Sequence, residues 1–409
     1  MHFKRQTGFA HPLFFLIIVV VLAVVSLAGW RVLSKKDNST SKILSSDASP
    51  GDKAIMAGKN LSGNRCEGDD ATTFTHLPMN ADDFNILIPY GLTVGGHVTP
   101  IDHQYFSPTV FNSPKDTYPV YAMADAQITG IEVHPPENGS NGRIRLVFTV
   151  SCTFFYYYDL VTSVEPGIDE KHIPISVKAG QLIGRIGGQT LDFAVWNTKK
   201  PLSGFINPSS YDGEAWKIYT ADPFPYYTTE LRKIVESKNP RVVEPIAGKI
   251  DYDVDGKLIG NWFEKGTGGY SGAGEGEDRN YFKTHLSFAP DLYDPRYFGV
   301  SIGSLYSQGQ NQSEMQHVTL ENAPQPQDVS MSTGLVKYSL VNWRYYKSDG
   351  SQWDQMSPAK DVTLKSETSV FGCALAQMTA ARELKFEVFV GKQCTSVPAF
   401  GSNAKIYTR

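Results

Sequence analysis

The sequence predicts a mainly β protein that is divided into more than one folded unit. The chain has 409 residues, which is more than one ordinary hydrophobic core accommodates. Tyr and Phe are abundant, at 21 and 22 residues, and 36 Gly and 24 Pro interrupt the apolar segments. Aromatic residues favour strands, whereas Gly and Pro favour turns, so this composition is typical of short strands joined by many turns.

Strand-like runs fill two segments of the chain, which we interpret as two β domains at residues 65–212 and 243–409. In the first segment the runs lie at residues 84–90, 120–124, 128–134, 143–158, 174–177, 182–187 and 190–196. We expect the second segment to form an antiparallel barrel or sandwich. A hairpin is predicted at its start, over residues 249–263, because Asp255-Gly256 is a preferred two-residue turn.

Residues 213–242 are interpreted as a linker that contains a connecting helix. Within it, residues 223–239 carry apolar side chains at helical spacing, from Tyr227 to Val235. Pro240 follows this run, and proline cannot continue a helix.

An uncharged apolar run at residues 13–30 predicts a membrane anchor. As a helix it would extend about 27 Å, just enough to cross a hydrocarbon core. We therefore predict a cytoplasmic N-terminus at residues 1–12, a transmembrane helix at 13–33, and a flexible stalk at 34–64 that is rich in Ser, Asn, Asp, Lys and Gly.

Two alternatives for this N-terminal segment stay open. A cleaved signal peptide has a shorter apolar region and ends at small residues, whereas this run ends in Gly-Trp-Arg. A pilin-like leader is suggested by Gly8-Phe9, but Leu13 stands where pilins carry a glutamate.

The charge distribution argues against nucleic acid as a partner. The net charge is −4 overall and +5 over residues 1–36, which leaves −9 for the rest of the chain. Polyanion binding depends on neutralisation of phosphates by Lys and Arg, which an acidic domain does not provide. The predicted partners are therefore the membrane and a component of the cell envelope, with the large C-terminal part outside the cytoplasm.

Four cysteines predict two disulfide bonds. Cys66 and Cys152 lie in the first half of the chain, and Cys373 and Cys394 lie in the second. None belongs to a Cys-x-x-Cys motif, which argues against a zinc knuckle or a thioredoxin-type site. In an exported protein we expect one disulfide within each half, and the alternative is four inert buried thiols.

Residues 120–196 contain four runs that match the core of a known family: VYAMADAQITGIEV, YYYDLV, VKAGQLIGRIGG and TLDFAVW. The AGQLIG segment at residues 179–184 is the clearest match. These runs resemble a degenerate version of the lysostaphin/LytM-type zinc metallopeptidases, which cut peptidoglycan crosslinks. The resemblance implies a β-sheet sandwich, or barrel-sandwich hybrid, for residues 65–212.

The catalytic positions of that family are not kept. Thr190 and Asp192 stand where the resemblance places the two histidines of a His-x-His motif, and Asp159 replaces another catalytic histidine. Asp159 and Thr190 are therefore the candidate catalytic positions. Neither supplies an imidazole, and a general acid or base contributes about 10²–10⁴-fold in rate.

Histidine and aspartate gather in the segment GGHVTPIDHQYF. His97, Asp102 and His103 lie there, and together with Asp192 they form the candidate metal ligands. Zinc is bound by such nitrogen and oxygen atoms, but a carboxylate-rich set acidifies its water less than three imidazoles do. We therefore predict no cofactor, with zinc as the alternative.

An aromatic run at residues 154–158 suggests a surface for sugar stacking. Because side chains alternate along a strand, Tyr156 and Tyr158 share one face and Tyr157 belongs to the other. One face is expected in the core. Tyr105, Tyr156 and Tyr158 are the candidate ligand-binding residues.

Two short motifs occur near the start of the second domain. Asp251-x-Asp253-x-Asp255 matches the beginning of an EF-hand loop, but the twelfth position is Trp262 rather than glutamate, which favours a plain hairpin. Gly260-Asn261-Trp262 resembles the Gly-x-Trp that opens lipocalin barrels, in which an arginine such as Arg409 packs on the tryptophan.

Two functions of different classes follow. The first is a single-pass envelope protein whose peptidase-like domain is inactive and binds cell-wall glycopeptide or a protein partner. The alternative is a divergent metal-dependent peptidoglycan hydrolase that uses His97, Asp102, His103 and Asp192. The sequence favours the first function, without enzymatic activity, because Asp159, Thr190 and Asp192 stand where the family has histidines.

Overall fold

The computed structural model describes residues 49–135, 142–273, 281–320 and 322–409. The predicted N-terminus, the anchor at 13–33 and the first part of the predicted stalk lie outside these ranges. Within the described ranges, no helix is long and apolar enough to cross a membrane. The prediction of a mainly β protein is confirmed.

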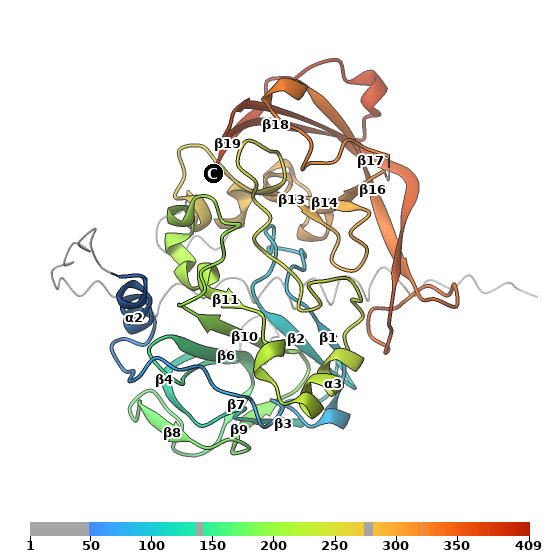
Figure 1. Cartoon of the computed structure of the whole chain (residues 1–409). Helices are drawn as coiled ribbons and strands as arrows, with labels where there is room; N and C mark the ends of the chain where they lie inside the picture. The colour runs from blue at the N-terminus through green and yellow to red at the C-terminus, as the bar shows by residue number, and fades with distance from the viewer. Residues whose placement is uncertain (1–48, 136–141, 274–280, 321) are drawn as a thin grey trace, which may run out of the picture.

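Two antiparallel β-sheets form the part of the chain that we call the sheet unit (Figure 1). The larger sheet has the order β1 (Phe84–Ile88), β2 (Gln104–Pro108), β10 (Leu191–Asn197), β6 (Phe154–Val161), β5 (Arg143–Thr149), β4 (Ala126–His134) and β8 (Ile175–Val177), and β11 (Thr220–Ala221) pairs with β10. The smaller sheet consists of β3 (Tyr118–Tyr121), β9 (Leu182–Ile186) and β7 (Ser163–Val164).

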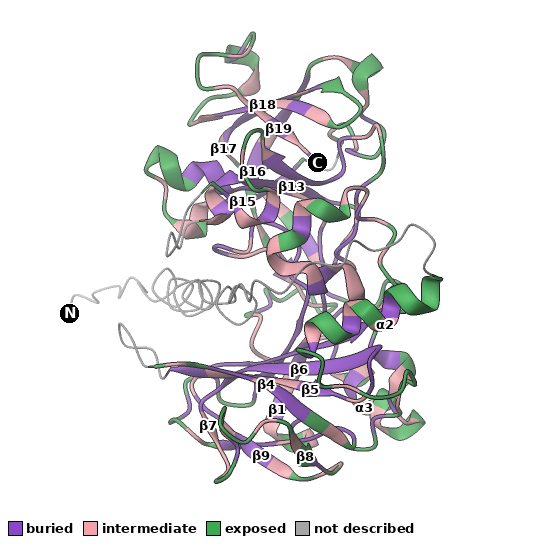
Figure 2. Cartoon of the chain, turned by 90° about the vertical axis from the view of Figure 1, so that its left-hand side faces the viewer, coloured by how far each residue is buried: buried purple, intermediate pink, exposed green. Residues whose placement is uncertain are grey.

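Strands β6 and β10 lie in the middle of the larger sheet and are buried at every position. On one face the rings of Tyr156 and Phe148 stack 4.5 Å apart, and on the other Tyr157 packs 5.1 Å from Trp196. Because both faces are covered, these strands are apolar along nearly their whole length instead of alternating with polar residues. Figure 2 shows β6 in the colour of buried residues.

The C-terminal part of the chain forms a closed eight-stranded barrel. Its strands are β12 (Gly260–Glu264), β13 (His285–Pro290), β14 (Phe298–Ile302), β15 (Gln316–Thr319), β16 (Val336–Tyr346), β17 (Thr363–Ala380), β18 (Glu383–Val390) and β19 (Lys405–Thr408). Each pairs with the next in antiparallel fashion, and β12 closes on β19. Of the two predicted architectures, the structure has the barrel, and apolar side chains such as Leu286, Phe288 and Tyr338 fill its core.

Trp262 is fully buried at the start of this barrel. The guanidinium carbon of Arg409 lies 4.0 Å from the centre of its ring, a cation–π contact. The same guanidinium donates hydrogen bonds to the carbonyl oxygens of Val254, Lys257 and Ile259. The expected packing of Arg409 on Trp262 is therefore present, and it ties the last residue of the chain to the segment that leads into the barrel.

The hairpin predicted at residues 249–263 does not form. Only β12 forms there, and it pairs with β13 and β19. The carboxylates that would have faced solvent on a hairpin instead bind backbone, because Gly204 N donates to Asp251 and Asn261 N donates to Asp253. These bonds occupy oxygens of two of the three carboxylates of the EF-hand-like motif, and the third, Asp255, pairs with Arg382.

Helices are few and short. Helix α3 (Thr229–Ser237) lies within the predicted connecting helix, and the side chain of its N-cap Thr228 accepts from Leu231 N. Short 3-10 turns occupy η1 (Ala81–Asp83), η2 (Pro208–Tyr219), η3 (Phe224–Tyr226), η4 (Gly269–Ser271), η5 (Tyr281–Thr284), η6 (Gly303–Gln308), η7 (Gln312–Glu314), η8 (Met331–Thr333) and η9 (Cys394–Ser396).

Helix α2 (Pro50–Leu61) lies inside the segment predicted to be a flexible stalk. It begins after the N-cap Ser49 and packs on the sheet unit, where the Thr198 hydroxyl donates to Ala54 O at 2.8 Å. Gly58 makes the closest approach, since a Cβ there would lie 1.7 Å from Cys152 O. The second half of the predicted stalk is therefore a docked helix, because a small residue lets the two backbones meet.

Both predicted disulfides are confirmed. Cys66 pairs with Cys152, and Cys373 pairs with Cys394. The first joins the chain just beyond α2 to the turn before β6, so it holds α2 against the sheet unit. The second lies within the barrel, where Cys373 is on β17.

Replacing Gly58 by Ala should release α2 from the sheet unit, because the added methyl would collide with Cys152 O. Gly51→Ala is the matched control, since it lies in the same helix and its new methyl would meet only the Ser49 hydroxyl at 3.8 Å. Both changes raise helix propensity by about 1 kcal/mol, so the comparison isolates packing. We expect the α2 amides to exchange with deuterium at least about tenfold faster in Gly58→Ala alone. Equal protection in both variants would contradict this docking.

Candidate functional site

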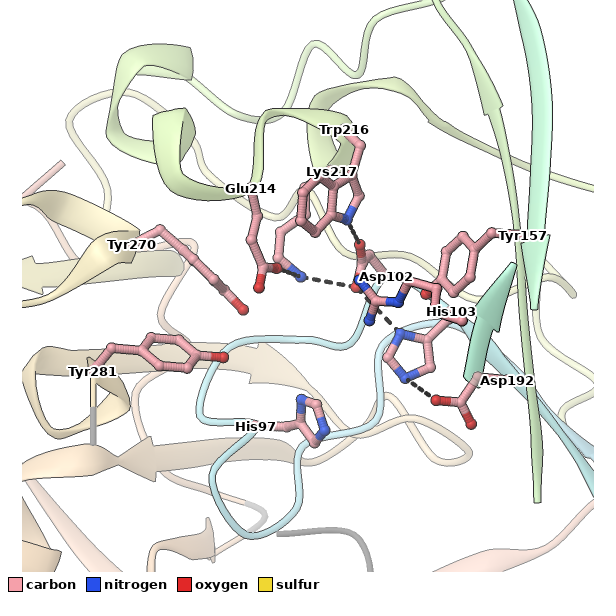
Figure 3. Close-up of a pocket in the computed structure, with 11 residues that line it drawn as sticks. His97, Asp102, His103, Tyr157, Asp192, Glu214, Trp216, Lys217, Tyr270 and Tyr281 are labelled. Carbon is pink, nitrogen blue, oxygen red and sulfur yellow. Dashed lines mark hydrogen bonds and ion pairs between the residues drawn. The ribbon is translucent and has the colours of Figure 1, made fainter. Parts of the chain in front are cut away.

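A pocket lies where the sheet unit meets the barrel (Figure 3). Its lining residues come from three sources: the β1–β2 loop, the middle strands with the η2 turn, and the β12–β13 connection of the barrel. They are His97, Asp102, His103, Arg145, Tyr157, Asp192, Glu214, Trp216, Lys217, Tyr270 and Tyr281. All four predicted metal ligands are among them, so the structure does bring these residues together.

The loop between β1 and β2 is held in place by both units. Gly91 N donates to Ile101 O across the base of the loop, and the Gln316 amide of the barrel donates to Gly95 O at 3.0 Å. Val98 packs against Phe282 and Met315 of the barrel. The position of His97 and Asp102 therefore depends on the barrel as well as on the sheet.

Asp102 forms an ion pair with Lys217 in this pocket. Lys217 Nζ lies 2.8 Å from Asp102 Oδ1 and 3.0 Å from Glu214 Oε2, and Trp216 Nε1 donates to Asp102 Oδ2 at 3.0 Å (Figure 3). Burial opposes charge on both groups, but the ion pair outweighs it. The pKa of Asp102 is held well below its ordinary value and the pKa of Lys217 is raised above its own.

His103 lies between two carboxylates. Its Nδ1 is 3.3 Å from Asp102 Oδ1, and its Nε2 is 3.3 Å from Asp192 Oδ2 and 3.0 Å from the Tyr105 hydroxyl. This arrangement follows from the sheet, because Tyr105 of β2 is the register partner of Asp192 on β10. The Thr190 hydroxyl donates to Asp192 Oδ1 at 3.3 Å.

Asp192 is the more easily protonated of the two aspartates that line the pocket. Burial raises the pKa of Asp192 to about 7, the nearby Asp159 adds to this effect, and His103 partly opposes it. His97 shows the converse behaviour, since burial and the positive charge of neighbouring groups lower the pKa of its imidazole to about 3. His97 is therefore neutral at pH 7.

Asp159 is directly opposite Asp192 in the pairing of β6 and β10. It binds Arg143 Nη1 at 2.7 Å and Arg145 Nε at 2.9 Å, and Leu160 N donates to it at 2.7 Å. Although burial favours the neutral acid, these arginines lower the pKa of Asp159 to about 2. The predicted catalytic position is thus occupied by a charged, fully paired carboxylate, which is a poor general base.

The residues present do not fit a zinc ion. Among the described residues, no three His, Cys, Asp or Glu side chains are arranged to hold a metal. Asp102 is already neutralised by an ammonium group, and both ring nitrogens of His103 lie beside other polar groups. A divalent cation would have to enter next to the positive charge of Lys217, which electrostatic repulsion opposes.

The structure does not place the predicted stacking residues at the pocket. Tyr156 and Tyr158 lie in the core of the sheet unit, where their hydroxyls donate to Ala124 O and Tyr121 O. Tyr105 is buried beside His103. The residue of the aromatic run that lines the pocket is Tyr157, which lies on the opposite face of β6 from Tyr156 and Tyr158.

Sequence reasoning missed the residues that the η2 turn and the barrel contribute. Glu214, Trp216 and Lys217 lie in the segment predicted to be a linker, and a kink in η2 at Glu214 turns them into the pocket. The one sequence feature that could have indicated them was the spacing of Glu214 and Lys217, three residues apart and next to Trp216. The hydroxyl groups of Tyr270 and Tyr281 point into the pocket from the barrel side (Figure 3).

No protein-family model matches the chain, and no curated protein matches it significantly. Solved structures similar to parts of it include a zinc-containing peptidase from Vibrio cholerae, at 19% identity and a TM-score of 0.24, with 32% of this chain and 38% of that chain covered. Csd3 of Helicobacter pylori matches at 16% identity and a TM-score of 0.18, with 31% and 36% covered. Lysostaphin matches at 11% identity and a TM-score of 0.24, with 81% and 90% covered.

The chain thus spans well under half the length of the first two of these proteins. TM-scores this low do not establish a shared fold. The chemistry of the pocket therefore follows from its own geometry.

Asp159→Asn should destabilise the protein strongly, because it leaves Arg143 and Arg145 buried without their counter-charge. Breaking a buried ion pair costs about 3–5 kcal/mol, and we expect the free energy of unfolding to fall by that amount. Asp125→Asn is the control, since Asp125 pairs with Lys178 at an exposed site and should have little effect. Urea unfolding followed by tryptophan fluorescence measures both. If both variants lost the same free energy of unfolding, the ion pairs of Asp159 would not contribute specifically to stability.

The pH dependence of stability should change when Asp192 is replaced by Asn. An unfolded aspartate titrates near about 4, whereas burial raises the pKa of Asp192 to about 7 in the folded chain. The stability that this group contributes is therefore complete below pH 4 and is lost as pH rises towards 7. We expect the wild type to lose more stability than Asp192→Asn over that interval in thermal unfolding scans. Parallel curves would contradict the raised pKa.

Proposed function

We propose that this chain is a membrane-anchored protein of the bacterial cell envelope, exposed outside the cytoplasm, whose pocket binds cell-wall glycopeptide without hydrolysing it. The observation that carries the proposal is that strong charges in the pocket, and on the strands beside it, are already neutralised by other side chains. Lys217 balances Asp102, and Arg143 and Arg145 balance Asp159. Such a site has groups that orient a ligand, whereas Asp159, the candidate general base, is held in an ion pair and does not readily accept a proton.

The placement outside the cytoplasm is supported by the cysteines and by the apolar run. Both disulfides are of the kind that persists in exported proteins. The uncharged run at residues 13–30 is long enough for an anchor. The acidic remainder of the chain suits a peptide or protein partner better than a polyanion.

The ligand class is supported by the chemical groups that line the pocket. Tyr157 and Trp216 contribute aromatic rings to the pocket lining, and Arg145, which lies over them at 5.3 and 6.0 Å, contributes a charged donor. The hydroxyls of Tyr270 and Tyr281 add hydrogen-bonding groups from the barrel side. A ligand with alternating amide, hydroxyl and carboxylate groups, as in a peptide attached to a sugar, matches this set.

The second candidate is a metal-dependent peptidoglycan hydrolase. The observation in its favour is that His97, Asp102, His103 and Asp192 all line one pocket. It requires the ion pair between Lys217 and Asp102 to open before a metal can bind. A measurement of amino groups released from muropeptides distinguishes the two functions, because only a hydrolase produces new amino groups.

Binding of soluble muropeptides to the full-length chain in detergent tests the proposal by isothermal titration calorimetry. Tyr281→Phe removes one pocket hydroxyl but keeps the ring contact with Tyr270. A lost hydrogen bond of about 0.5–1.5 kcal/mol predicts about 2–13-fold weaker binding. Tyr346→Phe, on the far part of β16, is the control and should bind like the wild type. Absence of binding at millimolar muropeptide, or release of amino groups by the wild type, would rule the proposed function out.

A further inference from the structure

Lys217 and Asp102 bring an amine and a carboxyl group together inside the protein. Lys217 Nζ lies 2.8 Å from Asp102 Oδ1, and the two side chains are only 6% and 4% exposed. The residues are 115 positions apart, so the contact joins the loop before β2 to the η2 turn. A nitrogen this close to one carboxyl oxygen lies about 3–4 Å from the carboxyl carbon, which is near the separation of reacting atoms.

Two further side chains are placed for acyl transfer to this amine. Glu214 Oε2 is 3.0 Å from Lys217 Nζ, so its carboxylate can accept a proton from the nitrogen. Trp216 Nε1 donates to Asp102 Oδ2 at 3.0 Å, so the indole N–H can stabilise negative charge that develops on this oxygen. Nucleophile, proton acceptor and oxyanion donor therefore converge on one carboxyl group (Figure 3).

The aromatic surroundings of the pair favour a neutral product. The rings of Tyr270, Tyr281 and Trp216 line the same pocket. Burying two opposite charges costs free energy of desolvation, and conversion of the pair into a neutral amide removes that cost. Exclusion of bulk water also protects such an amide from hydrolysis. Glu214 keeps a cationic neighbour after the reaction, because Arg145 interacts with it electrostatically.

We infer that Lys217 and Asp102 condense into an intramolecular isopeptide bond, with Glu214 as the catalytic base. Glu214 takes one proton from the ammonium group, and the free amine attacks Asp102 Cγ. The C–N bond forms, the bond from Cγ to Oδ1 breaks, and Oδ1 leaves as water with the proton held by Glu214 and a second proton from the nitrogen. The three ammonium hydrogens thus end as one amide hydrogen and two hydrogens of water, so the step needs no oxidant or reductant.

The bond fixes the loop before β2 to the η2 turn and so holds two walls of the pocket together. The inference goes beyond the proposed function and does not rest on it, because it depends only on the contacts of these side chains. Proximity alone does not single the pair out, since Lys178 Nζ and Asp125 Oδ2 are 2.7 Å apart. Those side chains are 80% and 62% exposed, so hydration keeps both charged and we expect them to stay unlinked.

Mass spectrometry of the full-length chain after reduction, alkylation and trypsin digestion tests the inference. An isopeptide bond blocks cleavage at Lys217, so the digest should contain residues 66–115 joined to residues 200–232. The mass of this species should be about 18 Da below the sum of the two peptides, because one water is lost. Without the bond, trypsin releases residues 200–217 and 218–232 separately. The peptides that carry Asp125 and Lys178 are the internal control and should be unlinked.

Two variants assign the parts of the reaction. Lys217→Arg keeps the positive charge beside Asp102 but supplies no amine, so the linked peptide should disappear. Glu214→Gln should slow bond formation at least about 100-fold, because the amine loses its proton acceptor, and residues 200–217 should dominate the digest of the freshly purified variant. Glu236→Gln is the matched control, since Glu236 pairs with Arg232 at the surface, and it should be linked like the wild type. Circular dichroism checks that each variant is folded.

The wild-type digest decides the inference whether or not a variant folds. Full release of residues 200–217 without any linked peptide would overturn it, and so would a linked peptide of unchanged mass in Lys217→Arg. A folded Glu214→Gln that is linked as fast as the wild type would overturn the assignment of the base. None of these outcomes changes what muropeptide titration of the wild type shows, so the proposed function is tested separately.

Discussion

The ion pair between Asp102 and Lys217 is the interaction on which the arrangement of the pocket depends. It joins the loop before β2 to the η2 turn, and Trp216 and Glu214 extend it on either side. The loop itself is clamped between sheet and barrel through Gly95 and Val98. Because a buried charge must be compensated, the pair determines which way each of these segments faces, and His103 follows its neighbour Asp102 into the pocket.

Buried carboxylates within the apolar strands set the second constraint. Asp159 and Asp192 face each other across β6 and β10, in a layer that is otherwise apolar or aromatic at most positions. Two adjacent negative charges in such a layer would be costly. Asp159 is charged because two arginines pair with it, which lowers its pKa. Asp192 is more readily protonated, because burial raises its pKa. Asp159 therefore stays charged, whereas Asp192 changes its protonation state near neutral pH.

Features of the fold that depend on local sequence patterns could be predicted, whereas features that depend on contacts between distant segments could not. The mainly β fold, an antiparallel C-terminal β domain, the connecting helix and both disulfides follow from local patterns and from the distribution of four cysteines, and the structure has them. Whether that domain is a barrel or a sandwich was left open, and the structure has the barrel. The docking of Arg409 on Trp262 was also anticipated, from a three-residue motif. The hairpin at residues 249–263 failed because Asp251 and Asp253 bind backbone groups of Gly204 and Asn261, and the stalk prediction failed at α2 because Gly58 fits against Cys152.

The sequence by itself determined which residues are chemically notable: His97, Asp102, His103 and Asp192, with their departures from a metallopeptidase pattern, and the uncharged run before them. Only the tertiary structure decided what these residues do. Lys217, more than a hundred positions beyond Asp102, reaches it through a turn that resembles a linker in sequence, and Tyr270 and Tyr281 close the pocket from the barrel. Charge compensation acts through space at a few ångströms, so the partner of a buried carboxylate is specified by the packing of distant segments and not by the residues beside it in the chain.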